Sequence, residues 1–81
     1  MIVNVSFFAA VKDMMGTESM ELSLDDEATI GELKQTLVEQ NPALMELAEK
    51  SIFSVDQEYV SDEKQLYHGA NVGFIPPVSG G

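Results

Sequence analysis

The sequence predicts an α+β domain in which a helix covers one face of a sheet. Three observations support this class. Two segments near the start alternate between apolar and polar residues, a helical repeat follows them, and short strand-like segments come after it. Strands followed by a helix and further strands are typical of α+β domains, because the helix buries its apolar stripe against the sheet.

The first predicted strand spans residues 2–8, where apolar and small or polar residues alternate as in a strand with one buried face. Phe8 would lie on the solvent side of this strand, together with the polar residues. A short helix over residues 9–15 is expected next, ending at Gly16, a residue suited to a helix C-cap. The residues predicted to face the core are Val3, Val5 and Phe7.

A second strand is predicted near residues 19–24, where alternate positions are again apolar. The main helix would begin after Thr29, because Thr29 and Glu32 have the spacing of a capping box. Pro42 would end that helix and open a short second one, in which Met45 is expected to fill the core. The main helix would bury one face, made of Ile30, Leu33 and Leu37.

The remaining segments are short. Residues 52–55 and 58–60 are predicted strands around a turn at Asp56 and Gln57, and residues 72–75 form the last strand. The predicted domain therefore covers residues 1–75, and residues 76–81 form a separate extended tail.

Composition excludes several classes of function. The chain of 81 residues is long enough for one small domain, and it contains no cysteine and a single histidine. Disulfides, cysteine-bound zinc and a thiol nucleophile are therefore unavailable, and we expect no metal site and no permanently bound cofactor. With four basic and fourteen acidic residues the net charge is −10, so a nucleic-acid partner is not expected. No apolar run could span a membrane and no basic leader is present, which favours the cytoplasm.

The C-terminal tail has an unusual composition. Pro76 and Pro77 would end sheet pairing and stiffen the chain, because proline lacks an N–H and has a fixed φ. Gly80 and Gly81 carry no side chains, so their backbone could enter a narrow slot. The reactive group of the tail is the carboxylate of Gly81, which becomes an acyl donor once it is activated. The tail therefore suggests a carrier whose terminus is worked on by another protein, although terminal residues without a role remain an alternative.

Several motifs resemble those of the molybdopterin synthase small-subunit family, whose members are ubiquitin-like sulfur carriers. The most specific is the terminal run Phe74-Ile75-Pro76-Pro77-Val78-Ser79-Gly80-Gly81. Weaker ones are Phe7-Phe8-Ala9, Val11-Lys12-Asp13 and Val55-Asp56-Gln57. The resemblance extends over essentially the whole chain and implies a β-grasp fold, with a mixed sheet and one main helix packed across it.

The resemblance also implies a reaction cycle and a set of partners. An ATP-dependent adenylating enzyme would activate Gly81, and a sulfur donor protein would convert its carboxylate into a thiocarboxylate. The carrier would then dock on the large synthase subunit, in a heterotetramer, and give sulfur to cyclic pyranopterin monophosphate. The large subunit would supply most catalytic side chains, while Gly80 and the segment Pro76, Pro77, Val78 and Ser79 would position the terminus.

Docking requires an exposed apolar patch near the tail. Phe8 and Ile75 are expected on the solvent side of their strands, and Tyr59 is a candidate third member; the alternative is that each is an ordinary exposed apolar residue. The chain departs from the family at His68-Gly69-Ala70-Asn71, where an acidic turn is common, and at Asp56, where asparagine is frequent. His68 is interpreted as a surface turn residue.

Three alternative functions stay open. The chain could carry sulfur for thiamine or for tRNA thiolation, using the same terminal chemistry. It could also be a ubiquitin-like binding module with no reaction at its end, or a modifier joined to other proteins through an isopeptide bond. The Pro-Pro-Val-Ser segment favours the molybdopterin branch.

Overall fold

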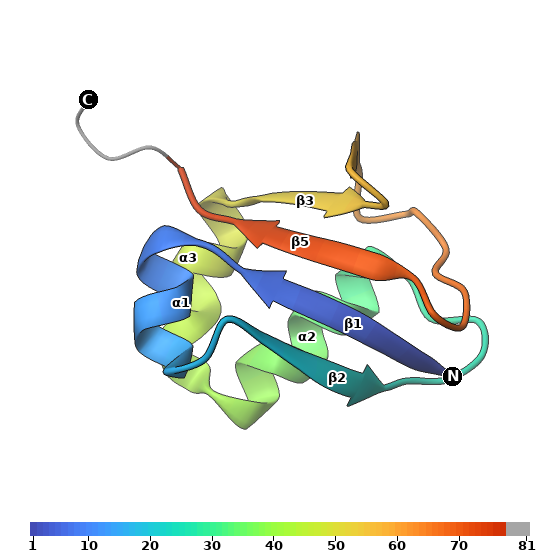
Figure 1. Ribbon diagram of the computed structural model, residues 1–81, viewed down its shortest axis with the longest axis horizontal. Coiled ribbons are helices and arrows are strands. Elements are labelled where there is room, and N and C mark those ends of the chain that lie inside the picture. The colour runs from blue at the N-terminus through green and yellow to red at the C-terminus, as the bar shows by residue number, and fades with distance from the viewer. Residues whose placement is uncertain (78–81) are drawn as a thin grey trace.

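Five strands form one mixed sheet in the computed structural model, which describes residues 1–77. Their order across the sheet is β2-β1-β5-β3-β4 (Figure 1). The first and last strands, β1 and β5, are parallel neighbours at the centre, and the other pairs are antiparallel. The strand bounds are β1 Ile2–Phe7, β2 Ser19–Ser23, β3 Ile52–Val55, β4 Glu58–Val60 and β5 Asn71–Ile75.

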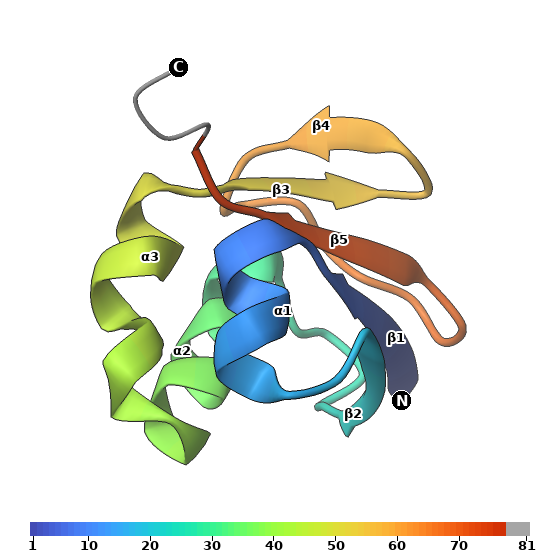
Figure 2. The same ribbon diagram turned by 60° about the vertical axis from the view of Figure 1, so that its left-hand side comes forward.

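The helices lie on one side of this sheet and leave its other face bare (Figures 1 and 2). The main helix α2, Ile30–Gln40, begins at Thr29, whose hydroxyl accepts a hydrogen bond from the N–H of Glu32 at 3.4 Å. The short helix α1 ends at Gly16, whose φ of 72° is the left-handed conformation that glycine adopts without strain. The remaining helical bounds are α1 Ala9–Met15, the 3-10 turn η1 Pro42–Leu44 and α3 Met45–Lys50.

The core fills the space between the helices and the covered face of the sheet. Phe74 of β5 is fully buried, with its ring centroid 4.6 Å from that of Phe53 and 6.4 Å from that of Phe7. The inward residues predicted from alternation and from helical spacing are all buried, which confirms the α+β prediction. They are Val3, Val5, Phe7, Ile30, Leu33 and Leu37.

The prediction that Met45 fills the core is wrong. Its side chain is 53% exposed, whereas Leu44 and Ala48 are buried. Leu44 and Ala48 are four residues apart and therefore share the inward side of the helical turn, which directs Met45 outward. The composition of this segment did not indicate which of its apolar residues would lie on that side.

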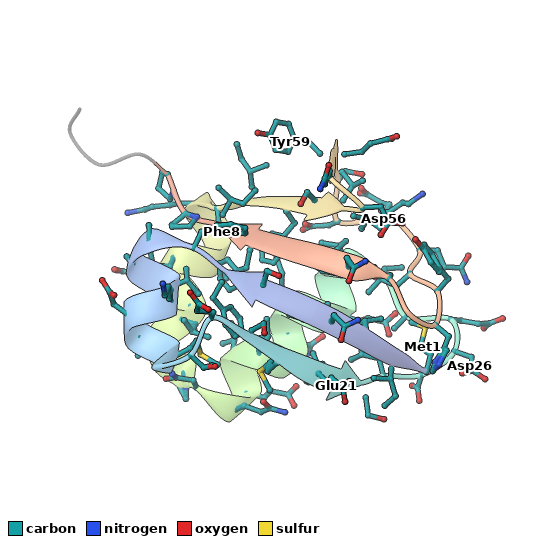
Figure 3. The ribbon with its side chains drawn as sticks, viewed as in Figure 1. Met1, Phe8, Glu21, Asp26, Asp56 and Tyr59 are labelled. Atoms are coloured by element: carbon teal, nitrogen blue, oxygen red, sulfur yellow. The ribbon has the colours of Figure 1, made fainter. Side chains whose placement is uncertain are left out.

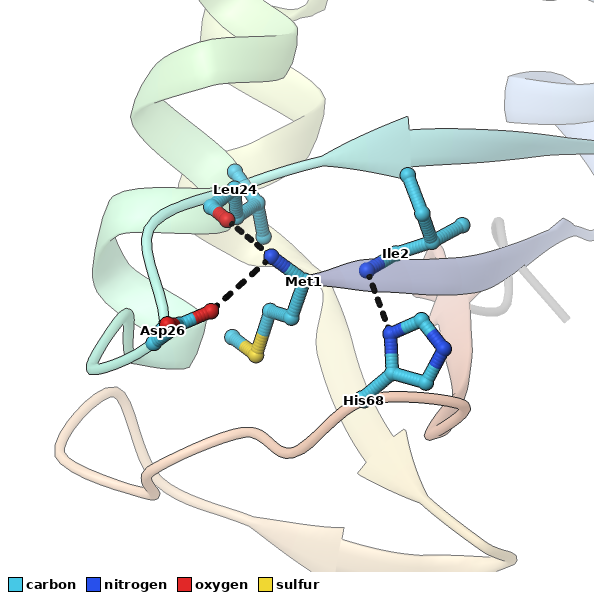
Figure 4. Close-up of polar contacts among 5 residues, drawn as sticks. All are labelled: Met1, Ile2, Leu24, Asp26 and His68. Carbon is cyan, nitrogen blue, oxygen red and sulfur yellow. Dashed lines mark hydrogen bonds and ion pairs between the residues drawn. The ribbon is translucent and has the colours of Figure 1, made fainter.

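His68 lies in the turn before β5, as predicted, and it has a structural contact there. Its Nδ1 atom accepts a hydrogen bond from the backbone N–H of Ile2 at 3.0 Å (Figure 4). Nearby, the amino group of Met1 donates to the carbonyl oxygen of Leu24 at 2.7 Å and lies 3.2 Å from Asp26 Oδ1. These bonds hold the start of β1 between the β2–α2 loop and the turn before β5.

Ala70, in the turn before β5, is part of the hydrophobic core. Its side chain is fully buried and packs in the core cluster. Its carbonyl oxygen accepts a hydrogen bond from the N–H of Asn4 at 2.9 Å. A carboxylate at this position would be removed from water without a basic partner, which is strongly unfavourable.

The β3–β4 hairpin turns through two residues in left-handed conformations, Asp56 with φ 50° and Gln57 with φ 72°. Such pairs form the tight turns that match the twist of two-residue hairpins. Asp56 Oδ1 accepts a hydrogen bond from the N–H of Asn71 at 3.1 Å, and its own N–H donates to the carbonyl oxygen of Asn71 at 2.8 Å. The aspartate thus supplies the acceptor oxygen that an asparagine would also offer, and it fixes the hairpin to the start of β5.

Candidate docking surface

A row of residues, all of them small except the last, crosses the bare face of the sheet from edge to edge. Gly73 in β5 is paired with Ser6 on one side and with Ser54 on the other. Ser19 continues the row at the β2 edge, and Tyr59 ends it at the β4 edge. Because side chains alternate along each strand, these residues all face away from the helices.

A depression of about 350 Å³ lies over this row. Gly73 forms its floor, since a Cβ atom there would lie 2.5 Å from Ser54 Oγ and 3.6 Å from both Phe8 Cε2 and Ile75 Cδ1. The depression therefore exists because residue 73 has no side chain. Its other lining residues are Ser6, Gln57, Tyr59, Asn71 and Val72.

The three predicted interface residues all line this depression. Phe8 is 47% exposed and Tyr59 is 74% exposed, while Ile75 is half-buried. Figure 3 shows Phe8 beside the end of β5 and Tyr59 above the β3–β4 edge. The structure thus brings together three residues from distant parts of the chain, although whether they bind a partner stays a prediction.

Ile52 is an additional member that was missed. It pairs with Ile75 across β3 and β5, and half of its side chain is exposed. The signal was present in the sequence, because Phe53 and Val55 face inward and alternation then directs Ile52 outward. We define the apolar patch as Phe8, Ile52, Tyr59 and Ile75.

The backbone around Phe8 holds its ring over the sheet. Phe8 is the extended N-cap of α1, and its carbonyl oxygen accepts a hydrogen bond from the N–H of Val11 at 3.1 Å. Ala9 follows with φ 49°, a left-handed conformation that costs an alanine about 1–2 kcal/mol. The strand therefore turns abruptly into the helix, and the Phe8 ring stays on the bare face.

The predicted tail begins directly beside the apolar patch. Sheet pairing ends at Ile75, as expected from the two prolines, and Pro76 is buried whereas Pro77 is exposed. The predicted site residues Val78, Ser79, Gly80 and Gly81 lie outside the residues that the structure describes. β5 is the central strand of the sheet, and its end lies beside Phe8 (Figure 3).

The described residues offer binding groups and few catalytic ones. Within residues 1–77 no group of three or more histidine, aspartate or glutamate side chains could hold a metal ion. No helix in this range is long and apolar enough to cross a membrane. The depression is lined by hydroxyl, amide and apolar side chains, with Tyr59 as its one ionisable residue among those described. The described surface therefore offers apolar, hydroxyl and amide groups, which are suited to docking.

Comparison with known proteins identifies the family. The model of the ThiS family matches residues 5–81, which is nearly the whole chain. The chain belongs to the ThiS family. Molybdopterin synthase sulfur carrier subunits are among its relatives: that of Escherichia coli is 35% identical over 82 residues, covering 99% of this chain and 100% of the relative. That of Chlamydomonas reinhardtii is 32% identical over 83 residues and covers 100% of both chains.

Solved structures confirm the ubiquitin-like β-grasp fold. SAMP1 from Haloferax volcanii superposes with a TM-score of 0.89 at 22% identity, over 100% of both chains. A putative molybdopterin converting factor, subunit 1, from Pyrococcus furiosus gives 0.85 at 26% identity, over 95% of this chain and 98% of that one. A complex of subunits 1 and 2 of the molybdopterin-converting factor from Helicobacter pylori gives 0.72 at 22% identity, over 100% of both chains.

Proposed function

We propose that this ThiS-family chain is the sulfur-carrier subunit of a molybdopterin synthase. The observation that carries the proposal is the apolar patch of Phe8, Ile52, Tyr59 and Ile75, which lies at the root of a tail ending in two glycines. The curated relatives with this name match over nearly their full length, which supports the same role.

The chemistry takes place on the last carboxylate of the sequence. An adenylating enzyme joins the Gly81 carboxylate to the AMP portion of ATP and releases pyrophosphate. A sulfide equivalent from a sulfur donor protein then displaces AMP and leaves a thiocarboxylate. Transfer of that sulfur to cyclic pyranopterin monophosphate, with water cleaving the bond between the acyl carbon and the sulfur, restores the carboxylate. The side chains of Gly80 and Gly81 are single hydrogen atoms, so both enzymes can enclose the terminus closely.

The described residues would bind the large subunit and orient the tail. The patch would bury its apolar side chains against the large subunit, and burial of apolar surface is the main favourable contribution to such association. A solved complex of subunits 1 and 2 in a structural neighbour supports a large-subunit partner. The rigid start of the tail, Pro76 and Pro77, would direct the terminus into the partner's active site, and two small subunits would occupy the heterotetramer.

Ile75→Asp tests the docking face. The substitution places a charge in the middle of the patch, so we expect calorimetry to show affinity for the large subunit lowered more than about tenfold. Ile2→Asp is a control, because Ile2 is an isoleucine on the same bare face, 37% exposed, at the far end of β1. The control should bind normally. Equal affinity of the wild type and Ile75→Asp would contradict the docking face.

Deletion of Gly81 separates a carrier from a binding module. A carrier loses all sulfur transfer while it keeps its fold and most of its affinity for the large subunit. A non-reactive binding module would show no functional loss. Covalent adducts on lysine side chains of other proteins would instead favour a modifier, and sulfur transfer in a thiamine or tRNA pathway would favour the other carrier branches.

A further inference from the structure

The depression over Gly73 contains a polar group that the fold does not use. Ser54 is 7% exposed, yet among the described residues its hydroxyl has no hydrogen-bond partner. It lines the depression from β3, opposite the Ser6 hydroxyl on β1. Among the described residues no fully buried side-chain nitrogen or oxygen lacks a partner, so the Ser54 hydroxyl is open to the depression, where it can bond with another molecule.

The walls and the floor of the depression favour different parts of an occupant. Phe8, Tyr59 and Ile75 offer apolar and aromatic surface at the sides, whereas Ser6 and Ser54 offer hydroxyl oxygens below. A purely apolar side chain would remove both hydroxyls from water without replacing their hydrogen bonds, which is unfavourable. The occupant therefore needs an apolar stem and a donor at its tip.

The negative charge of the chain favours a cationic group at the tip of the occupant. The chain has a net charge of −10, and no lysine lines the depression. The Asp56 carboxylate lies beside the depression, because it accepts a hydrogen bond from the N–H of Asn71, one of the lining residues. An arginine has a long apolar stem, a planar group that stacks on aromatic rings, and five N–H donors, and it is enriched at the centres of interfaces.

We propose that the depression over Gly73 receives an arginine side chain of the docked large subunit, with the Ser54 and Ser6 hydroxyls accepting from its guanidinium group. This proposal rests on the docking face proposed above. Gly73 is then a specificity-determining residue, because any side chain there would fill the space that the arginine enters. The apolar patch would supply affinity around the arginine, and the two serines would fix its position.

The test measures affinity for the purified large subunit by calorimetry, together with the melting temperature of each variant. Ser54→Ala should weaken binding by about tenfold, the usual effect of losing a hydrogen bond to a charged group. Ser19→Ala is the matched control, because Ser19 lies in the same row but outside the depression, and it should bind normally. The double variant Gly73→Ala/Ser54→Ala removes the 2.5 Å clash and fills the floor, and it should bind more weakly still.

Alanine substitution of each surface arginine of the large subunit identifies the occupant. One of these substitutions should lose most of its effect when combined with Ser54→Ala, as expected for two groups in contact. Unchanged or tighter binding of Ser54→Ala would overturn the proposal and indicate an apolar occupant or water. The absence of any coupled arginine would also overturn it. If Ile75→Asp binds normally, the docking face itself is refuted, and this proposal falls with it.

Discussion

The contact between Asp56 and β5 allows a quantitative test of how the docking surface is held. Asp56 contributes in two separable ways: its carboxylate accepts a hydrogen bond from the N–H of Asn71, and its backbone adopts a left-handed φ of 50°. Asp56→Asn keeps both contributions. Asp56→Gly removes the hydrogen bond but tolerates the left-handed backbone. Asp56→Ala removes the hydrogen bond and also strains the backbone. The hairpin carries Tyr59, so the series also reports on the patch.

The expected magnitudes follow from the two contributions. Asp56→Asn keeps an acceptor oxygen and tolerates the left-handed conformation, so its unfolding free energy should stay close to that of the wild type. Asp56→Gly loses the hydrogen bond and about 1 kcal/mol. Asp56→Ala loses the bond and also places an alanine in the left-handed region, for a total of about 2 kcal/mol. For a domain of this size, these losses correspond to roughly 4–8 °C and 8–16 °C in Tm.

Thermal unfolding followed by circular dichroism measures the series, with urea unfolding as a second estimate. From most to least stable, the predicted order is the wild type together with Asp56→Asn, then Asp56→Gly, then Asp56→Ala. An alanine variant as stable as the wild type would refute the reasoning, because neither the bond nor the backbone conformation would then matter. An asparagine variant as unstable as alanine would show that the negative charge, and not the acceptor oxygen, stabilises the turn.

Three further substitutions test other parts of the fold by the same unfolding measurements. Gln57→Gly should raise the free energy of unfolding by about 0.5 kcal/mol, because relief of the left-handed strain exceeds the entropic cost of glycine; a lower Tm would contradict this. Thr29→Ala should cost about 1 kcal/mol through the lost N-cap of α2, and no change would mean that the cap is unimportant. Phe74→Ala should cost about 3–5 kcal/mol, since its ring is fully buried between two other rings; a loss below 1 kcal/mol would refute that packing.

The elements of the fold could be predicted because their periodicity is strong. Val3, Val5 and Phe7 alternate, and Ile30, Leu33 and Leu37 recur at helical spacing, so each segment shows its own buried side. The short helix after Pro42 offered too few residues for a clear period, and Met45 was accordingly placed on the wrong side. Alternation also placed Phe8 and Ile75 on the bare face correctly.

The depression over Gly73 could not be predicted, for a different reason. Alternation assigns a residue to a face of the sheet but does not say which residues of neighbouring strands lie opposite each other. Ser6, Gly73 and Ser54 meet only through the registers of β1, β5 and β3, which depend on long-range pairing. The partner of the Asp56 carboxylate was hidden for the same reason, because Asn71 belongs to another strand.

The central claim, that sulfur is carried on the last residue of the tail, is tested most directly by intact-mass spectrometry. The full chain would be incubated with the adenylating enzyme, ATP and a sulfide source, with a chain lacking Gly81 as the control. We expect one oxygen of the full chain to be replaced by sulfur, with fragmentation locating the change at Gly81, and no change in the control. A full chain that forms no thiocarboxylate with an enzyme that adenylates it would contradict the claim.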